Sequence, residues 1–284
     1  MTANVVHRID RLEIDSFGEC IYCGALAKDV ELTDEHIIPF SLGGKAVIRE
    51  GSCRECARET AKLENEIAHK VLWEFRAHVK SPTRRKKSRP TELPFTYSIA
   101  GGERLTKSVP IVDHPFFTPM PVWGRPGLLT GKQPTTEFEH CKAHVFSSVP
   151  PNIKQTLALG DGVPAELPFP EFQINHNLYA RGIAKIAYCD AVGRFGLRKF
   201  RRLVLPDLIL GRYPCIPYFV GCQLDDPPPP TAREVLHEII LGPQVINGIR
   251  LHVSSIRLFA NSGVEEHGPP VYEVVVGAPG IGAI

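Results

Sequence analysis

Two pairs of cysteines, each with two residues between them, constrain the fold of this chain more than any other feature. The pairs are Cys20-Ile-Tyr-Cys23 and Cys53-Arg-Glu-Cys56. Because the thiolates of such a pair lie one short turn apart, both sulfurs can reach a single tetrahedral ion at about 2.3 Å. Two pairs complete a four-sulfur site that leaves no position for water, so the sequence predicts a structural Zn²⁺.

Other interpretations of these four cysteines are independent buried thiols or a catalytic dithiol, but no thioredoxin-like pattern surrounds either pair. A module of roughly 60 residues has a small core, and structural zinc contributes roughly 10–16 kcal/mol to the folding of small zinc peptides. Zinc is therefore expected to hold the module together. The four remaining cysteines have no matching spacing and are expected to be ordinary buried or partly buried thiols: Cys141, Cys189, Cys215 and Cys222.

The composition is that of a soluble globular protein, since 43% of the 284 residues are apolar and 23% are charged. The first 15 residues have no apolar signal-peptide region, and no later apolar run approaches the roughly 18 residues of a membrane helix. We therefore expect a cytoplasmic protein with no membrane segment. The formal net charge is only +2, so attraction to a polyanion requires local clusters of Lys and Arg.

A long helix is predicted after the second cysteine pair. Ser52 is a possible N-cap, and an apolar residue recurs every four positions at Leu63, Ile67, Val71 and Phe75. Leu72 and Trp73 widen this stripe. The helix must end before Pro82, where a basic linker begins. This pattern predicts a module at residues 1–80, a linker at 81–90 and a second, mixed domain at 91–284.

The second domain mixes strands and helices. Residues 91–175 are rich in Pro and Gly with short β-prone runs such as 95–99. Residues 177–192 are predicted to be helical, with Asn175 or Asn177 as the N-cap and Gly193 or Gly196 at the end. A short helix is expected near 231–241, after four prolines, and strands are expected at 248–258 and 272–276. No repeat of fixed period is present. The predicted fold class is α+β.

The segment between the cysteine pairs reads Thr33-Asp-Glu-His-Ile-Ile-Pro-Phe-Ser-Leu-Gly-Gly44. An acidic residue, His, two apolar positions and Pro, followed by Gly-Gly and flanked by two Cys-x-x-Cys knuckles, resembles the HNH (ββα-metal) endonucleases. The resemblance covers residues 16–80. It implies a treble-clef zinc module that hydrolyses phosphodiester bonds in DNA, with RNA not excluded, and leaves 5′-phosphate and 3′-hydroxyl ends.

The resemblance makes His36 the general base and Glu35 a ligand of a catalytic Mg²⁺ or Mn²⁺. A histidine titrates near pH 6.5 and can accept a proton from water at neutral pH, and a divalent ion of this kind prefers hard oxygen ligands. Strand alternation sends Glu35 and His36 to opposite faces unless the strand bends. The arrangement that the family implies therefore needs a kink at Pro39 or before it.

One position departs from the family pattern. The second metal ligand is usually an Asn directly after the last cysteine, where this chain has Ala57. Thr60 and Glu64 should share a helical face with Ala57, and helical side chains lean toward the N-terminus. Glu64 is our candidate replacement ligand, with Thr60 or Asp34 assisting. The alternatives are that Glu64 is a solvated residue, with the ion held by Glu35, water and substrate, or that the nuclease is crippled.

A basic block follows the predicted helix and is expected to bind nucleic-acid phosphates. Its members are Arg76, Lys80, Arg84, Arg85, Lys86, Lys87 and Arg89. A second basic cluster is a weaker candidate for phosphate binding and contains Arg198, Lys199, Arg201 and Arg202. His140-Cys141-x-x-His144 could form another metal half-site, but it has no partner pair.

Two other classes of function remain open from the sequence. One is a zinc-dependent nucleic-acid-binding or scaffolding protein whose active site is degraded at Ala57. The other is a nuclease subunit that acts only within a defence or mobile-element assembly. Residues 91–284 are expected to select the substrate, sense a signal, or dock a protein partner or a second copy of the chain.

Overall fold

A computed structural model gives the fold. It describes residues 12–82, 90–99, 103–157, 159, 165–166, 173–223, 228–232, 234–262 and 268–280. The described residues form both helices and mainly antiparallel sheets, so the predicted α+β class is confirmed. In the described part of the chain, no helix is both long enough and apolar enough to span a bilayer.

The N-terminal part is a small sheet followed by a helix. Its strands are β1 (Glu13–Ile14), β2 (Leu32–His36) and β3 (Val47–Cys53), in the order β1-β3-β2. β2 and β3 pair antiparallel, and the short 3-10 helix η1 (Phe40–Leu42) lies between them in sequence. Because β3 runs directly into α1 (Arg54–Asn65), the last strand and the first helical turn are held in a fixed relation.

The predicted long helix is present in three pieces. α1 continues into η2, a π-helical segment (Glu66–Val71), and then into α2 (Trp73–His78). The four residues of the apolar stripe are all buried, which confirms the predicted face, and the last piece ends before Pro82. Two details were wrong. The N-cap is Cys53 and not Ser52, and Trp73 is 39% exposed and does not widen the stripe.

The π-helical segment coincides with a close helix contact. A Cβ atom on Gly182 of the next long helix would lie 2.5 Å from Cδ1 of Ile67, so the missing side chain lets the two segments approach. The extra residue of a π-turn shifts the helical phase, as the bond from the Leu72 N–H to the Ile67 carbonyl shows. Periodicity alone does not reveal this change of phase.

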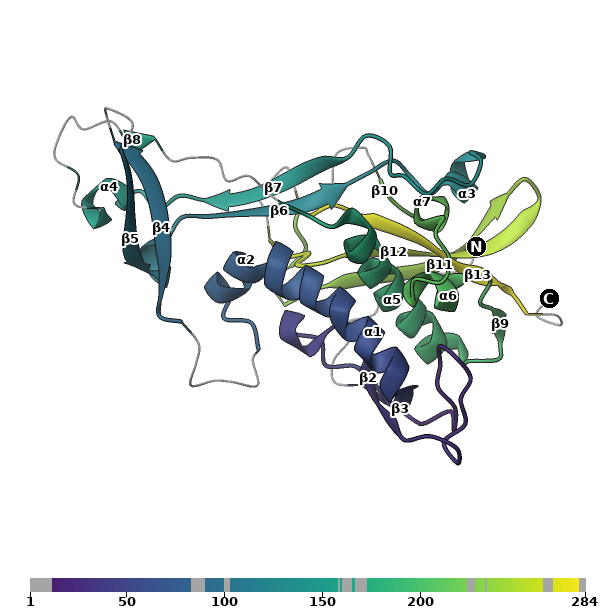
Figure 1. Cartoon of the computed structure of the whole chain (residues 1–284). Coiled ribbons are helices and arrows are strands. Elements are labelled where there is room, and N and C mark those ends of the chain that lie inside the picture. Colours follow the sequence, from purple (N-terminus) through teal and green to yellow (C-terminus); the bar gives the residue numbers. More distant parts are fainter. Residues whose placement is uncertain are drawn as a thin grey trace.

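The helix α5 (His176–Phe195) lies at the centre of the molecule. The side chain of Asn175 caps it by accepting the Leu178 N–H at 3.0 Å, and Gly196 ends it with φ +82°, as predicted. Nearly every residue between Tyr179 and Val192 is buried. In Figure 1, α1 lies in front of α5 and the C-terminal sheet runs behind it, which is why most of α5 is buried.

The C-terminal sheet is antiparallel and has the order β10-β13-β12-β11, with β9 also paired to β13. Its strands are β9 (Phe200–Arg201), β10 (Val220–Cys222), β11 (Glu238–Ile246), β12 (Ile249–Arg257) and β13 (Tyr272–Pro279). The two predicted strands, at 248–258 and 272–276, are confirmed. The helix predicted near 231–241 is wrong, because β11 begins at Glu238 and pairs along its whole length with β12.

Three short helices complete the central body: α3 (Gly127–Thr130), α6 (Leu205–Ile209) and α7 (Ile216–Phe219). The two longer helices α1 and α5, together with the sheet, share one apolar core.

A second group of strands extends from the body (Figure 1). The ribbon of β6 (Phe116–Val122) and β7 (Lys142–Ser148) leads to a sheet of β4 (Glu92–Ile99), β5 (Arg104–Pro110) and β8 (Ala165–Glu166). The strand predicted at 95–99 is thus part of β4. The helices η4 (Ile111–Asp113) and α4 (Ile153–Thr156) lie in this region, which has its own small apolar cluster around Phe95, Val109 and Ile153.

The main core runs from the cysteine module to the C-terminal strands without interruption. Leu63 and Ile67 belong to the same buried cluster as Ile183 of α5 and Val274 of β13. The module therefore buries its apolar face against elements more than 100 residues away in sequence. Most of the boundary predicted at 81–90 lies outside the described residues, and the division into domains stays a prediction.

Candidate active site and metal centre

The four paired cysteines converge. Cys20 and Cys23 lie in the turn that precedes β2, whereas Cys53 ends β3 and Cys56 lies in the first turn of α1. Their four Sγ atoms all lie within 4.8 Å of one another, and those of Cys23 and Cys53 are 3.7 Å apart. Zn–S bonds of about 2.3 Å place tetrahedral sulfurs roughly 3.8 Å apart. The cluster therefore fits a structural zinc ion.

The electrostatics of the cluster also call for a cation. A hydrogen bond with Cys56 lowers the pKa of Cys20, and the same contact raises the pKa of Cys56. Four sulfurs this close cannot all be thiolates unless a positive charge offsets them. Within the described ranges, this is the only convergence of three or more potential Cys, His, Asp or Glu ligands, and His140, Cys141 and His144 form no such group.

Three of the other four cysteines match the prediction of buried or partly buried thiols, since Cys189 and Cys222 are buried and Cys215 is half-buried, but Cys141 is exposed. Buried Cys189 of α5 lies 3.2 Å from the hydroxyl of Tyr22, a residue of the first knuckle. The hydroxyl of Tyr188 donates to the Ile21 carbonyl, which also accepts from Arg202 at 2.9 Å. The knuckle is thus attached to α5 and to the residues that follow it.

The acidic residues of β2 separate onto two sides of the strand. Glu35 is 4% exposed and faces the helices, and a Cβ on Gly51 would come within 2.8 Å of its Cβ. Asp34 is exposed and accepts the Glu50 N–H at 3.0 Å and the Arg49 guanidinium at 3.5 Å. Asp34 therefore stabilises β3 at Glu50 and lies apart from the Glu35 side chain.

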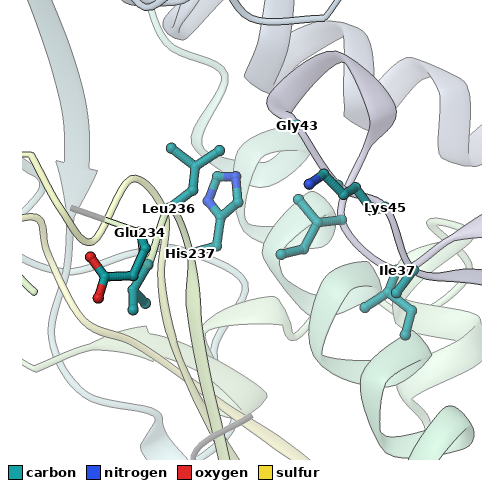
Figure 2. Close-up of a pocket in the computed structure, with 10 residues that line it drawn as sticks. Ile37, Gly43, Lys45, Glu234, Leu236 and His237 are labelled. Carbon is teal, nitrogen blue, oxygen red and sulfur yellow. The ribbon is translucent and has the colours of Figure 1, made fainter. Parts of the chain in front are cut away.

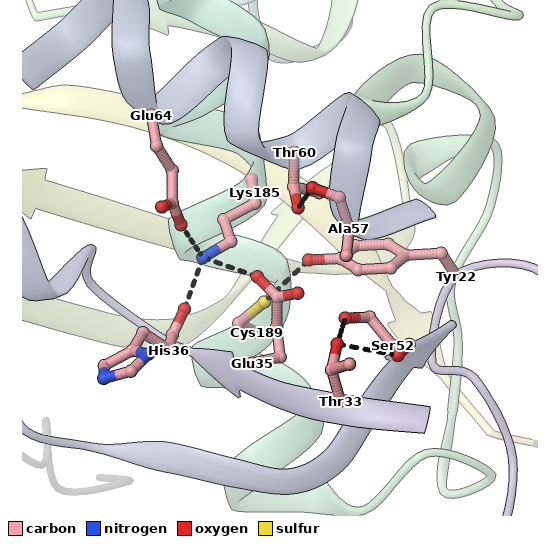
Figure 3. Close-up of polar contacts among 10 residues, drawn as sticks. All are labelled: Tyr22, Thr33, Glu35, His36, Ser52, Ala57, Thr60, Glu64, Lys185 and Cys189. Carbon is pink, nitrogen blue, oxygen red and sulfur yellow. Dashed lines mark hydrogen bonds and ion pairs between the residues drawn. The ribbon is translucent and has the colours of Figure 1, made fainter. Parts of the chain in front are cut away.

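His36 ends β2 and is half-buried. Its imidazole makes an edge contact with the Phe40 ring, at 5.9 Å between centroids, and Figure 3 shows it pointing away from the Glu35 carboxylate. The chain then turns at Pro39, where η1 begins, and passes through Gly43 with φ +96°. The expected turn at Pro39 is present, but Glu35 and His36 still point to opposite sides.

Glu64 reaches back to Glu35 through a third residue that the sequence analysis missed. Nζ of Lys185, from the middle of α5, lies 2.8 Å from Oε1 of Glu35 and 2.9 Å from Oε1 of Glu64. The same ammonium donates to the backbone carbonyl of His36 (Figure 3). Lys185 is 1% exposed, and these three oxygens match the three N–H donors of its ammonium.

The charge of Lys185 is determined by its partners. Burial by itself lowers the pKa of the Lys185 ammonium, but the carboxylates of Glu35 and Glu64 raise it above its ordinary value, so Lys185 is protonated at neutral pH. One positive charge thus faces two carboxylates. The only signal in the sequence was a lysine between apolar residues in the middle of the predicted helix.

Thr60 and Ala57 lie on α1 above this group (Figure 3). Thr60 is 3% exposed, and its hydroxyl donates to the Ala57 carbonyl at 3.2 Å, one turn earlier in the helix. This bond uses the hydroxyl hydrogen inside α1. Of the candidate ligands, the structure brings Glu35 and Glu64 together, whereas Thr60 and Asp34 are bonded elsewhere.

Only part of the predicted basic block lies within the described residues. Nε of Arg76 donates to the Ser41 carbonyl and its Nη1 donates to the Ala68 carbonyl, both at 2.7 Å. Arg76 therefore ties α2 to η1, and this use of its guanidinium was not predicted. Lys80 is exposed. The other five residues fall outside the described ranges: Arg84, Arg85, Lys86, Lys87 and Arg89.

Two residues of the second basic cluster form contacts within the molecule. Arg198 forms an ion pair with Glu19 at 2.6 Å, and Arg202 is bonded to the first knuckle, as described above. Lys199 and Arg201 are exposed.

A cavity of about 280 Å³ lies beside the loop that follows His36 (Figure 2). One wall is the segment from Ile37 to Ala46, and the opposite wall is the segment from Glu234 to His237. His237 accepts the Phe259 N–H on Nδ1, so its Nε2–H donates to the Leu42 carbonyl at 2.8 Å. Burial lowers the pKa of His237 to about 4. This neutral imidazole fastens the loop to the C-terminal sheet.

Residues 20–72 match the HNH endonuclease family. A search of curated proteins and a search of solved structures find no match to the chain. The matched segment includes the four clustered cysteines together with Glu35, His36 and Glu64, but it ends far before Lys185. The match confirms the predicted resemblance and indicates nuclease activity, with nucleic acid as the class of substrate.

Proposed function

We propose that the HNH endonuclease module at residues 20–72 hydrolyses phosphodiester bonds of DNA, with His36 as the general base. The observation that carries the proposal is the meeting of the Glu35 and Glu64 carboxylates at the Lys185 ammonium, which also bonds the His36 backbone carbonyl, on a framework held by four cysteines. In this proposal Glu64 takes the role of the metal ligand that is missing at Ala57. We expect 5′-phosphate and 3′-hydroxyl ends, in keeping with the family.

In this proposal His36 takes the proton of the attacking water. Its half-buried ring is within reach of solvent, and its contact with Phe40 limits the directions in which the ring can turn. Its backbone carbonyl is fixed by Lys185, which holds the end of β2 in place. A histidine held in this way is suited to deprotonate a water molecule at neutral pH.

The residues that would hold Mg²⁺ or Mn²⁺ are Glu35 and Glu64, through the carboxylate oxygens that do not face Lys185. Two hard oxygen donors suit either ion. The ion would neutralise charge on the scissile phosphate and on the leaving oxygen. The Glu64 side chain is 32% exposed whereas that of Glu35 is 5% exposed, so Glu64 forms the open side of this pair.

The phosphate backbone would be held by Lys80 and by the linker residues Arg84, Arg85, Lys86, Lys87 and Arg89. Arg76 is not among the proposed phosphate-binding residues, because its guanidinium already bonds two backbone carbonyls.

Incubation of the purified chain with supercoiled plasmid tests the activity. We expect nicking with Mg²⁺ or Mn²⁺, none with EDTA, and recovery when the divalent ion is added back. Single-stranded RNA and DNA of the same sequence, run in parallel, decide between the two classes of nucleic acid. Plasmid that stays intact under every metal condition would contradict the proposal.

The second candidate is a protein that binds nucleic acid without cutting it. Ala57 in place of the usual ligand and an ammonium between the two carboxylates favour this alternative, since both reduce the attraction of the site for a divalent ion. Retention of labelled duplex in a gel-shift assay, with no cleavage in the same tube, would support it.

A further inference from the structure

Hydrophobic packing does not explain the position of Lys185. It lies in the middle of α5 with buried neighbours on both sides, among them Ala184 and Ile186, and it belongs to the part of the chain beyond the matched segment. A buried lysine is costly unless its charge is paired and all its donors are bonded. Here three oxygens satisfy it, and two of them are those of the proposed metal ligands.

The Glu35 and Glu64 carboxylates in turn depend on the positive charge of Lys185. The Glu35 side chain is 5% exposed, so water does little to stabilise its negative charge. Glu64 lies close by and adds a like charge. A cation between the two is therefore required for them to converge, whether that cation is an ammonium or a metal ion.

We propose that Lys185 is a positioning residue that acts as the resident cation of the active site. It holds Glu35 and Glu64 together when no divalent ion is bound, and its charge weakens the binding of that ion. The inference rests on the proposed function of Glu35 and Glu64 as metal ligands. Because Lys185 is 1% exposed, it acts through the two carboxylates and does not touch the substrate.

The site thus belongs to both parts of the chain. β2 supplies Glu35, α1 supplies Glu64 and α5 supplies the cation. The net charge of the three side chains is −1, which still attracts Mg²⁺ or Mn²⁺ but less strongly than two carboxylates alone would.

The test uses the zinc-loaded full chain and the variant Lys185→Met, which keeps most of the length of the side chain and removes its charge. Thermal unfolding is followed by circular dichroism with and without Mn²⁺, and Mn²⁺ binding is measured by electron paramagnetic resonance. Lys62→Met is the matched control, because Lys62 lies on α1 in an exposed ion pair with Glu59 at 2.7 Å.

Without Mn²⁺, we expect Lys185→Met to melt at least about 10 °C below the wild type, because a buried carboxylate has lost its partner. Mn²⁺ should restore most of this loss, and its dissociation constant should fall at least about 10-fold, because a unit charge close to the ion is gone. Lys62→Met should behave as the wild type. An unchanged Mn²⁺ affinity, or a loss of stability that Mn²⁺ does not reduce, would overturn the inference.

A second variant covers the case in which Lys185→Met does not fold. Lys185→Met with Glu35→Gln removes both buried charges, so it should fold without Mn²⁺ and bind the ion at least about 10-fold more weakly than the wild type. If this double variant also fails to fold, Lys185 acts through packing and the inference is wrong.

The two proposals fail separately, because neither of these measurements involves cleavage. A chain that binds Mn²⁺ as expected but leaves plasmid intact contradicts the nuclease proposal and retains the role of Lys185. A chain that cuts plasmid while Lys185→Met binds Mn²⁺ as the wild type does contradicts the role of Lys185 alone.

Discussion

Glu35 and His36 are adjacent in sequence and face opposite sides of the end of β2. Glu35 is buried against the helices, where its charge is paired, whereas His36 keeps a half-buried ring toward solvent. Strand alternation alone produces this placement. The carboxylate can hold an ion while its neighbour handles a proton, and the Lys185 ammonium touches both residues.

Replacement of His36 by Ala tests the general base. We expect the cleavage rate to fall at least ~10²-fold, as is typical when a general base is lost. The melting temperature should change little, because the ring is half-buried and packs against the exposed Phe40. Initial rates of plasmid nicking and circular dichroism measure the two quantities. Full cleavage by the variant would remove His36 from the mechanism.

At the scale of elements, the four-cysteine cluster fixes how α1 follows the β2–β3 hairpin. The site depends on this junction, because Glu35 lies on one side of it and Glu64 on the other. A second fixed point is His237, which fastens η1 to the segment before β11 and to Phe259.

Removal of one clustered cysteine should unfold the module. Structural zinc contributes roughly 10–16 kcal/mol in small zinc peptides, which is comparable with the total stability of a domain. Cys53→Ser should therefore lose both bound zinc, measured by inductively coupled plasma mass spectrometry, and the cooperative melting transition. Cys141→Ser, at an exposed cysteine outside the cluster, is the control and should keep both. Zinc retained by Cys53→Ser at one ion per chain would contradict the assignment.

Acid should weaken the fold through His237. Its pKa is about 4 in the folded chain and near 6.5 when unfolded, so below pH 6.5 the unfolded chain takes up a proton that the folded chain does not. The stability that depends on neutral His237 is complete above about pH 6.5 and is lost as the pH falls to about 4.

The size of this effect is about 3 kcal/mol in the free energy of unfolding. Urea titrations at pH 7 and pH 4.5 measure it in the wild type and in His237→Gln, which should show a smaller pH dependence. His140→Gln provides a matched control. Equal pH dependence in wild type and His237→Gln would remove His237 from the account.

At the scale of the whole molecule, α5 joins the module to the C-terminal sheet and supplies the cation of the site. The module packs its apolar face against residues 91–284, which therefore share its core. The cavity between the loop after His36 and the segment at 234–237 lies on the same junction.

A fragment of residues 1–82 tests this dependence. It keeps the four cysteines but lacks Lys185 and the surface of α5, so we expect it to be insoluble or to show no cooperative unfolding transition. Expression of the fragment beside the full chain, followed by circular dichroism, decides the matter. A soluble, cooperatively folding fragment would support an independent domain at residues 1–80.

The linker predicts a salt dependence of DNA binding. If its five basic residues each neutralise one phosphate, the logarithm of the association constant should fall with the logarithm of salt concentration at a slope of about −4.5. Fluorescence anisotropy on a labelled duplex over a range of KCl concentrations measures it. Changing the five residues to Gln should remove most of this slope, whereas Lys199→Gln with Arg201→Gln should leave it nearly unchanged.

The sequence by itself determined the features that depend on local spacing. The cysteine pairs, the apolar stripe of Leu63, Ile67, Val71 and Phe75, and the caps of α5 each involve residues a few positions apart, where backbone geometry fixes the outcome. The segment around His36 was found through its resemblance to the HNH endonucleases. Glu64 was proposed near Glu35 from the family's ligand position at Ala57, together with helical geometry.

Only the tertiary structure decided which partners these residues have. Lys185 is 149 positions from His36 and 121 from Glu64, and Arg76 is 35 positions from Ser41. The strand at 238–246 exists because it pairs with β12, against the helix that local preference favoured. A positively charged group or a backbone donor can bond to any oxygen that lies nearby. Which oxygen lies nearby depends on how distant segments of the chain pack.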